Sequence, residues 1–216
     1  MPGPPTRVVD PVAPVADLPL GQQETRIHWT KFHRKIVVGT ASTLEGQVVT
    51  EEGAIGGADV DLYARAATSQ AWTHVASATT DSERGVFAFG CLEPVRTTLY
   101  RVVHEATPFH ARSSGDKQVA VARRLPDSLE RVRANRFSFR GTVLPRDAGL
   151  SVQLERRTCR TCAWRTVERT TTDRRARWGF RIDVSRLEGS RWYRATAPGD
   201  QRNARGHSDR VWRFTR

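Results

Sequence analysis

Pairs of apolar residues separated by one polar residue recur along most of this chain. They appear between residues 42 and 121 and again between residues 137 and 214, with Gly, Asp, Ser or Pro between successive pairs. The first set is Val60/Leu62, Val86/Ala88 with Phe87/Phe89, Tyr100/Val102 and Val119/Val121; the second is Phe137/Phe139, Val152/Leu154, Trp178/Phe180/Ile182, Tyr193/Ala195 and Trp212/Phe214. A spacing of two predicts short antiparallel strands with one buried face.

Helices are not expected in this chain. No window of twelve residues keeps a helical spacing of apolar residues, and Val, Thr, Trp and Phe dominate the apolar runs. These residue types favour strands. The pattern therefore predicts an all-β protein, and about seven strands in roughly 95 residues is typical of an immunoglobulin-like (Ig-like) sandwich.

The strand pattern is repeated within the chain. Residues 71–81 read AWTHVASATTD and residues 163–173 read AWRTVERTTTD, which match at six of eleven positions. At the same offset of 92, Val60 falls on Val152 and Leu62 on Leu154; at 93, Phe87 falls on Phe180, Tyr100 on Tyr193 and Arg101 on Arg194. A period near 93 residues is the size of a small β domain rather than of a solenoid repeat.

This repeat predicts three parts. Residues 1–23 form an extended N-terminal arm, residues 24–122 a first Ig-like domain and residues 123–216 a second one, joined where residues 122–128 interrupt the strand pattern. One position departs from the alternation: Trp72 and Val75 have opposite parity on one strand. Either a bulge separates them or Trp72 packs at the edge of the sandwich.

Five motifs resemble a known family. They are a strand ending around Gly46 or Gly141 (LEGQVV, FRGTV), VDLYAR or VQLERR, W-x-x-V closing in TTD, G-x-F-x-F, and TTLYRVV or SRWYRAT. From about Thr25 to Arg216 the chain resembles the tandem bacterial Ig-like or carboxypeptidase-regulatory-like repeats of actinobacterial type, found in surface proteins and in actinobacteriophage virion proteins. The resemblance implies modules that bind, space or decorate, because a fold alone does not assign a function.

Charge separates the two copies. Residues 24–122 contain ten basic and eleven acidic residues, whereas residues 123–216 contain 24 Arg and ten acidic residues, a net charge of +14. A copy with this excess is expected to dock against an acidic surface. Arg174, Arg175 and Arg177 follow Asp173 in a turn and form the predicted partner-binding basic face.

The distribution of Arg and Trp residues in the second copy indicates which class of acidic partner is expected. The Arg residues run from Arg123 to Arg216 without a basic helix or a nucleic-acid motif, and the Trp residues of the second copy lie on core patterns or match Trp72 of the neutral copy. Nucleic acid is therefore not favoured. Protein subunits of an assembly, or an anionic cell-wall polymer, are the expected partners.

The N-terminal sequence bears on where the protein works. Its Pro residues break every apolar pair, so it lacks the features of an export signal, and no membrane-spanning stretch is present. We therefore expect a protein made in the host cytoplasm that works in a virion, with the cell surface as the alternative. Pro2, Pro4, Pro5, Pro11 and Pro14 remove backbone donors, which predicts an extended arm that contacts a partner subunit.

The cysteines allow several interpretations. Cys159 and Cys162 stand in TCRTC between two predicted strands, where a C-x-x-C could be a zinc half-site, a redox pair or a disulfide across a hairpin. A zinc site needs four ligands, and the second copy has no second C-x-x-C to complete it. A redox site needs a helix N-terminus, which is not expected here. The disulfide and two free thiols remain as the alternatives. Cys91 is expected to be a small buried residue.

Catalytic patterns are missing from the sequence. Five of the six His are scattered before residue 111, and there is no H-E-x-x-H, G-x-S-x-G or P-loop. Asp81 and Asp173 match between the copies, and a turn-forming role is expected for both rather than calcium binding or catalysis. We expect no cofactor and no enzyme.

The sequence thus predicts a non-enzymatic structural or binding protein. Its most specific form is a bacteriophage virion component, such as a capsid decoration, head–tail or minor tail protein, that docks through the arm and the basic second domain. The alternatives are an actinobacterial envelope-binding protein and, with less support, a nucleic-acid-binding protein.

Overall fold

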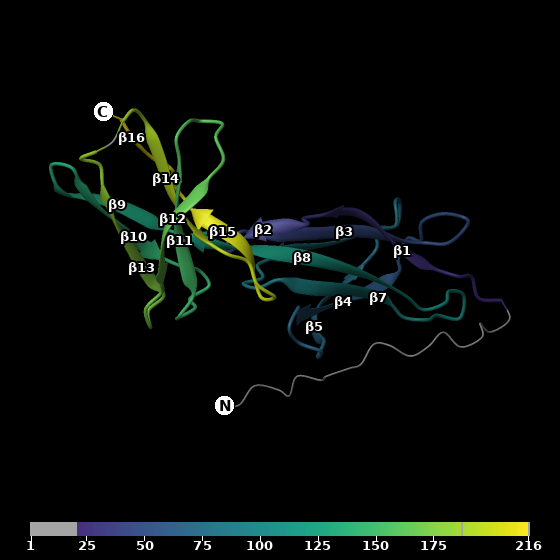
Figure 1. Cartoon of the computed structure of the whole chain (residues 1–216). Coiled ribbons are helices and arrows are strands. Elements are labelled where there is room, and N and C mark those ends of the chain that lie inside the picture. Colours follow the sequence, from purple (N-terminus) through teal and green to yellow (C-terminus); the bar gives the residue numbers. More distant parts are fainter. Residues whose placement is uncertain (1–20, 187, 216) are drawn as a thin grey trace. The chain divides into compact units, whose positions relative to one another are not determined.

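The computed structural model describes residues 21–186 and 188–215, and every regular element among them is a β-strand (Figure 1). The all-β class expected from the period-two pattern is confirmed. In the part of the chain that the structure describes, no helix is long and apolar enough to cross a membrane. The chain divides into two compact units, the first ending at Val121 and the second beginning at Ala122.

Unit 1 is a sandwich of two antiparallel sheets. Its strands are β1 (Arg26–Phe32), β2 (Lys35–Val37), β3 (Ser42–Val49), β4 (Asp59–Ala66), β5 (Thr73–Thr79), β6 (Val86–Leu92), β7 (Thr98–His104) and most of β8 (Ser113–Leu125). One sheet has the order β1-β3-β6; the other runs β5-β4-β7-β8, with β2 added on β8. The apolar positions of the sequence pattern meet between the sheets, where Leu44, Leu62, Phe87 and Val102 are almost fully buried.

Unit 2 repeats this arrangement. Its strands are β9 (Asp127–Arg133), β10 (Arg136–Thr142), β11 (Ser151–Arg157), β12 (Arg165–Thr171), β13 (Arg177–Asp183), β14 (Arg191–Ala197), β15 (Ala204–Ser208) and β16 (Trp212–Phe214). One sheet has the order β13-β10-β9 and the other β12-β11-β14-β15, with β16 pairing β14. Phe139, Val152, Leu154, Phe180 and Tyr193 fill the core. Both units are therefore Ig-like sandwiches, in which β1-β3-β6 corresponds to β9-β10-β13 and β5-β4-β7 corresponds to β12-β11-β14.

Two glycines locate equivalent positions in the two units. A β-carbon on Gly46 would lie 2.6 Å from the Phe87 ring, and one on Gly141 would lie 2.7 Å from the Trp178 ring. Gly46 pairs with Phe87 across β3 and β6, and Gly141 pairs with Trp178 across β10 and β13. Phe87 therefore corresponds to Trp178, and the alignment of Phe87 with Phe180 read from the sequence is wrong by two residues.

The cause of this shift is a shorter turn in unit 2. In unit 1, Asp81 accepts hydrogen bonds from the N–H groups of Arg84 at 2.7 Å and Val86 at 2.9 Å, and Gly85 adopts a φ of 62°. In unit 2, Ala176 takes the left-handed conformation, with a φ of 59°. The expected turn-forming role of Asp81 is confirmed, and the missing turn glycine is replaced by an alanine that bears the steric cost.

The polar segment after Val121 does not interrupt a strand. β8 continues to Leu125, and only Pro126 separates it from β9. Arg123, 2% exposed, donates hydrogen bonds to Asp200 at 2.8 Å, to Asp147 at 3.2 Å and to the Pro198 carbonyl oxygen at 3.3 Å. The break expected at residues 122–128 is wrong because these carboxylates let a charged side chain enter the interior.

Candidate functional site

The predicted basic residues lie in and beside the turn that leads into β13. Asp173 accepts hydrogen bonds from the backbone N–H groups of Arg177 at 2.9 Å and Arg175 at 2.8 Å, and its carboxylate pairs with the Arg177 guanidinium at 2.8 Å. These bonds, first that from the Arg177 backbone, hold the pKa of Asp173 below its ordinary value. Asp173 is thus a turn-forming residue, as expected, and Arg174, Arg175 and Arg177 are exposed.

Arg177 begins a regular array of arginines on the outer face of β10 and β13. The cross-strand pairs are Thr142 with Arg177, Arg140 with Gly179, Ser138 with Arg181, and Arg136 with Asp183. Each pair contains one arginine, and the arginines alternate between the strands at steps of two residues, or about 6.7 Å. All four are exposed, whereas the intervening residues of β13 point into the core.

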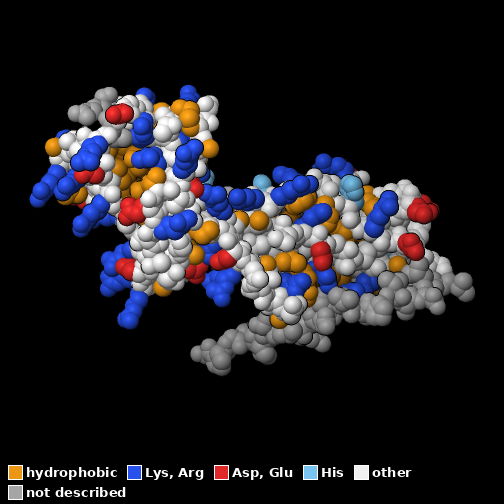
Figure 2. Space-filling view, in the orientation of Figure 1, with side chains coloured by type: hydrophobic (Ala, Val, Ile, Leu, Met, Phe, Trp, Pro, Cys, Tyr) orange, Lys and Arg blue, Asp and Glu red, His pale blue; other side chains and the backbone are white. Residues whose placement is uncertain are grey.

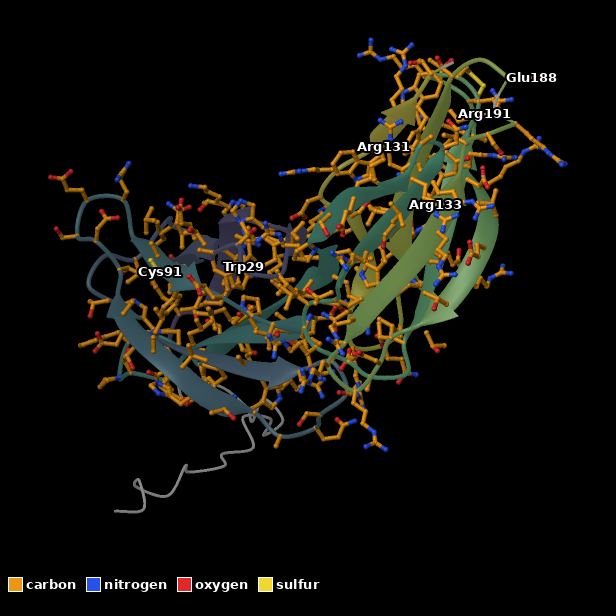
Figure 3. The ribbon with its side chains drawn as sticks, turned by 90° about the vertical axis from the view of Figure 1, so that its left-hand side faces the viewer. Trp29, Cys91, Arg131, Arg133, Glu188 and Arg191 are labelled. Atoms are coloured by element: carbon orange, nitrogen blue, oxygen red, sulfur yellow. A yellow bond between two sulfur atoms is a disulfide. The ribbon has the colours of Figure 1, made fainter. Side chains whose placement is uncertain are left out.

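Two adjoining hollows follow this array. One, of about 550 Å³, is lined by Ser138 and Gly179 together with Arg140, Arg177 and Arg181. The other, of about 530 Å³, shares Ser138 and Arg181 and continues past Arg136 to Arg133 of β9, which is marked in Figure 3. We call the surface formed by Arg136, Arg140, Arg177 and Arg181, with Ser138 and Gly179 between them, the arginine trough.

Small residues create the space in the trough. Gly179 carries no side chain, and a β-carbon there would have no neighbour closer than 3.7 Å, at the Arg140 Cβ. Ser138 supplies a hydroxyl at the point where the two hollows meet. The result is a row of guanidinium groups with room for carboxylate-sized or phosphate-sized groups among them.

Three arginines of the trough are held by exposed carboxylates. Arg140 pairs with Glu130 at 2.5 Å, and Arg136 pairs with Asp183 at 3.2 Å. In each of these pairs and in the Arg177–Asp173 pair, the arginine side chain is at least 59% exposed. Such pairs contribute about 0–1 kcal/mol. They orient the guanidinium groups without preventing an incoming anion from reaching them.

The outer face of the other sheet of unit 2 uses its arginines differently. The guanidinium groups of Arg157 and Arg194 lie over the Trp164 ring, at 4.6 and 4.3 Å from its centroid. Arg157 also lies 5.8 Å from the Trp192 ring, on which Arg213 stacks at 5.2 Å. These arginines are engaged in cation–π contacts within the unit.

Unit 1 contains the same stack. Arg65 and Arg101 lie 4.9 and 4.6 Å from the centroid of Trp72, which is buried and precedes β5. The opposite parity of Trp72 and Val75 comes from a bulge in β5, where Val75 is an extra residue between the partners of Leu62 and Tyr63, so the bulge alternative is confirmed. The matched Arg and Trp residues of the two copies are therefore structural, and their rings are contacted by guanidinium groups.

Glu155 neutralises the centre of this second face. Its carboxylate accepts hydrogen bonds from Arg194 at 2.7 Å and from the Thr196 hydroxyl at 2.9 Å, and it also pairs with Arg205. The Glu155 side chain is 5% exposed. A buried carboxylate shared by two arginines holds these guanidinium groups within the unit.

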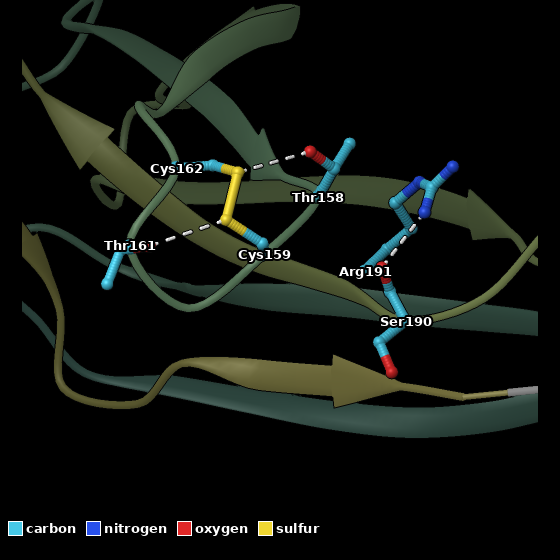
Figure 4. The surroundings of a disulfide bond; sticks show 6 residues. All are labelled: Thr158, Cys159, Thr161, Cys162, Ser190 and Arg191. Atoms are coloured by element: carbon cyan, nitrogen blue, oxygen red, sulfur yellow. Dashed lines mark hydrogen bonds between the residues drawn. A yellow bond between two sulfur atoms is a disulfide. The ribbon is translucent and has the colours of Figure 1, made fainter.

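Cys159 and Cys162 are bonded to each other in the loop between β11 and β12. Their Cα atoms are 5.1 Å apart, and the Thr158 hydroxyl approaches the Cys162 sulfur at 3.5 Å (Figure 4). The bond closes a loop of four residues that contains the exposed Arg160. Among the residues that the structure describes, no group of His, Cys, Asp and Glu could hold a metal ion.

Cys91 is exposed, and its expected burial is wrong (Figure 3). Leu44 pairs with Phe89 and Ser42 with Leu92, so β6 has one residue more than β3 across this stretch. This bulge places Cys91 at a φ of 56° and turns its side chain out of the core. A change in alternation of this kind is not visible in a single sequence.

The predicted arm lies mostly outside the described residues. Pro2, Pro4, Pro5, Pro11 and Pro14 fall in residues 1–20, which the structure does not describe. Gln23, at the end of the arm, pairs with His110 and donates its N–H to the Phe109 carbonyl oxygen at 2.9 Å. The Gln22 amide bonds the Thr107 carbonyl oxygen at 2.6 Å. These last residues contact their own unit, contrary to the expectation for the arm as a whole.

The arginines at positions 136, 140 and 181 were not singled out by the sequence pattern. Each is an ordinary polar residue at an outward position of a strand. Their common feature appears only when the register of β10 and β13 is known. A usable signal is the alternation of Arg and apolar residues in RWGFRID, which predicts that the arginines share one face.

Comparisons with known proteins concern the fold. No protein-family model matches the sequence, and no curated protein matches it. The structure is similar to a tetra-tandem repeat from the extending region of a large adhesion protein, with 17% identity over 89% of this chain and 48% of that one and a TM-score of 0.42. The chain thus spans about half the length of that repeat segment.

Two further similarities involve structures that are matched over nearly their whole length. A segment of two fibronectin type-III domains from chicken tenascin is 9% identical over 87% of this chain and 97% of that one, with a TM-score of 0.46. The chicken interferon gamma receptor alpha chain is 9% identical over 88% and 97%, with a TM-score of 0.44. The chain is built of tandem Ig-like repeats, and its actinobacterial type stays a prediction.

Proposed function

We propose that the protein is a non-enzymatic docking component of a multi-subunit assembly, and that unit 2 binds an acidic surface of another subunit. The observation that carries this proposal is the contrast between equivalent positions. Register places Glu45 and Val86 of unit 1 where unit 2 has Arg140 and Arg177, and Gly90 follows Phe89 at a bulge where unit 2 has Arg181 after Phe180. The arginine array of β10 and β13 is thus not repeated on β3 and β6 of unit 1.

The charge of unit 2 as a whole supports the same proposal. Residues 123–216 have a net charge of +14, and Figure 2 shows Lys and Arg side chains gathered over the part built by β9–β16. Charge of this size attracts acidic partners over distances of about 10 Å at 0.1 M salt. A phage virion is the specific assembly that we propose, in the role of a decoration, head–tail or minor tail protein.

The arginine trough favours a protein partner over nucleic acid. The Trp rings of unit 2 are either buried, as Trp178 is, or contacted by guanidinium groups, as Trp164 and Trp192 are. Bases that stacked on the Trp164 or Trp192 ring would therefore have to displace these guanidinium groups. Acidic carboxylates need only the exposed guanidinium groups.

The experiment uses the full chain in the cells that make it. Particles are separated from free protein on a density gradient, and the chain is quantified in each fraction by mass spectrometry. We expect the chain in the particle fraction, with release when the salt is raised from about 0.1 to about 1 M, because the screening length falls from about 10 to about 3 Å. A chain found only as free protein, or only with nucleic acid, would overturn the proposal.

A matched pair of variants locates the docking surface. Arg140→Ser with Arg181→Ser removes two charges from the trough, and Arg160→Ser with Arg202→Ser removes two exposed charges from loops of the same unit. Only the first variant should leave the particle fraction. Equal retention of both variants would show that the trough is not the docking surface.

A further inference from the structure

The geometry points to a specific ligand: the arginine trough binds an extended peptide segment with Asp or Glu at every second residue. This inference rests on the proposed function and names the part of the partner that unit 2 recognises. It commits to a protein ligand, with nucleic acid and other polyanions as outcomes of the test.

Spacing is the first argument. The four arginines stand at successive levels about 6.7 Å apart, because each level is two residues along a strand. In an extended peptide, side chains on one face recur at the same interval of two residues, about 6.7 Å. Carboxylates at alternate positions would therefore meet Arg177, Arg140, Arg181 and Arg136 in turn, over a segment of about seven residues.

Charge density is the second argument. The trough presents one arginine per step of about 6.7 Å, whereas duplex DNA carries one charge per ~1.7 Å of its axis. The hollows are also lined by the carboxylates of Glu168 and Asp183, which would repel a uniformly dense polyanion. A segment in which acidic and neutral residues alternate matches the lower density and brings neutral side chains to the intervening positions.

The shape of the trough is the third argument. The two hollows share Ser138 and Arg181, so they form one elongated depression rather than a single pit. Gly179 leaves open space beside Arg140, and Ser138 offers a hydroxyl between the hollows. An elongated depression with guanidinium groups on both sides suits a strand-like ligand, since each carboxylate can receive a charge-assisted hydrogen bond.

The binding test uses synthetic peptides and the full chain. The first peptide has twelve residues with Glu and Thr alternating; the second has the same composition with its six Glu in one block. A thymidine oligonucleotide with six phosphates is the third ligand. Fluorescence anisotropy at about 0.05 M salt, where screening is weaker than at 0.15 M, should show the alternating peptide binding at least about fivefold more tightly than the block isomer.

Two variants test the position of the peptide. Arg140→Ser with Arg181→Ser should weaken binding of the alternating peptide about tenfold, since it removes two of four charged contacts. Arg160→Ser with Arg202→Ser, which removes the same charge elsewhere, should change it less than about twofold. A similar loss in both variants would overturn the inference, because binding would then depend on net charge alone.

A variant that fills the hollow at Gly179 tests whether peptide binding depends on the shape of the trough as well as on its charge. Gly179→Val keeps every arginine and places a β-branched residue where a β-carbon has only ordinary contacts. A β-branched residue suits a strand better than glycine, so folding should be unimpaired while peptide binding falls about fivefold or more. Unchanged binding would overturn the placement of the ligand over Gly179.

The outcomes distinguish the inference from the proposed function. If both peptides bind equally, or the oligonucleotide binds most tightly, the alternating-peptide ligand is wrong, even when the chain is found in particles and released by salt. If the alternating peptide binds at the trough but the chain is never found in an assembly, the ligand class stands and the proposed function falls.

Discussion

The outer faces of β3–β6 and β10–β13 are the same surface in two copies of one fold. Each covers a core in which an aromatic ring packs over a strand glycine, Phe87 on Gly46 in unit 1 and Trp178 on Gly141 in unit 2. Facing outward, unit 1 has Glu45, Ala88 and Val86. Unit 2 has arginine at two of the three equivalent positions and glycine at the third.

This difference shows how two copies of one fold can present different outer faces without a change of fold. The inward positions of a strand are fixed by the core, and only the alternate positions can change freely. The cation–π stacks, in contrast, are kept in both copies, since Arg65, Trp72 and Arg101 of unit 1 have counterparts in unit 2. Features shared by the copies concern stability, and features confined to one copy are candidates for function.

The largest expected effect tests the shared scaffold. Gly141→Ala would place a β-carbon 2.1 Å from the Pro126 carbonyl oxygen and 2.7 Å from the Trp178 ring. Because a backbone atom must move, we expect unit 2 to lose about 3 kcal/mol or more of unfolding free energy. Chemical denaturation of the full chain, followed by NMR signals assigned to each unit, measures the loss.

Gly179→Ala is the control for that prediction. It changes glycine to alanine in the same sheet, at a position with open space, and should leave the stability of unit 2 within about 0.5 kcal/mol or raise it. Comparable losses in the two variants would show that the packing of the ring over Gly141 is not what constrains this position.

The next effect compares the cation–π stacks. Trp72 is 6% exposed and Trp164 is half-buried, although each ring is contacted by two guanidinium groups. We expect Trp72→Ala to cost unit 1 about 3 kcal/mol through lost packing and Trp164→Ala to cost unit 2 about 1 kcal/mol, mainly from the cation–π contacts. Equal costs, measured by the same unit-resolved denaturation, would mean that burial does not distinguish the two stacks.

A transfer of residues between the faces tests the comparison itself. Arg140→Glu, Arg177→Val and Arg181→Gly give unit 2 the residues of unit 1 and should weaken binding of the alternating Glu–Thr peptide about 30-fold, since three exposed ion pairs of up to about 1 kcal/mol each are lost. Fluorescence anisotropy measures the change. The reciprocal transfer, Glu45→Arg, Val86→Arg and Gly90→Arg, should create a second peptide site in unit 1.

The reciprocal variant also provides the contradicting outcome. If unit 1 gains no binding although its backbone register matches that of unit 2 through Phe89, then arginine spacing alone does not make the site. The difference in peptide binding between the two units would then depend on the shape of the hollows.

The smallest effect is the response to acid. Backbone hydrogen bonds hold the pKa of Asp173 low, and hydrogen bonds from Ser185 do the same for Asp183. For Asp200, burial is the largest single effect and raises the pKa, but the hydrogen bonds from Arg123, Asn203 and Arg202 and the Arg123 charge together lower it. A lowered folded pKa gives stability that is present above the unfolded value, about 3.9, and is lost as the pH falls through the folded value.

Unit 2 has three such carboxylates, whereas Asp81 in unit 1 has a pKa lowered by the N–H groups of Arg84 and Val86. We therefore expect unit 2 to lose stability more steeply below about pH 4. Unit-resolved NMR during acid titration checks this order. Simultaneous loss of both sets of signals would count against it.

Much of the fold can be predicted from the sequence because apolar and polar residues alternate along the strands, and the apolar ones face the core. The pairs Val60/Leu62 and Tyr100/Val102 are buried as the pattern predicts, and their repeats in unit 2 are buried as well. The alignment of the copies failed at Phe87, where one turn is shorter and an alanine takes a positive φ. Such a change moves the register without altering the apolar pattern.

The candidate site could be predicted only in part. The exposed turn residues Arg174, Arg175 and Arg177 stand out as a run of charge, but only Arg177 belongs to the trough, and Arg140 and Arg181 join it through cross-strand pairing. Pairing depends on the register between distant segments, which one sequence does not specify. The bulge that exposes Cys91 has the same origin, since it is defined by two strands together.

The bond between Cys159 and Cys162 also affects how the chain responds to proteases. An exposed loop tip is a preferred place for cleavage, and Arg160 lies at such a tip, inside the loop that the two sulfur atoms close. A trypsin-like protease that cut after Arg160 would leave β11 and β12 covalently joined. The pieces would separate only after reduction, so the stack of Arg157 on Trp164 could survive a break in the backbone between them.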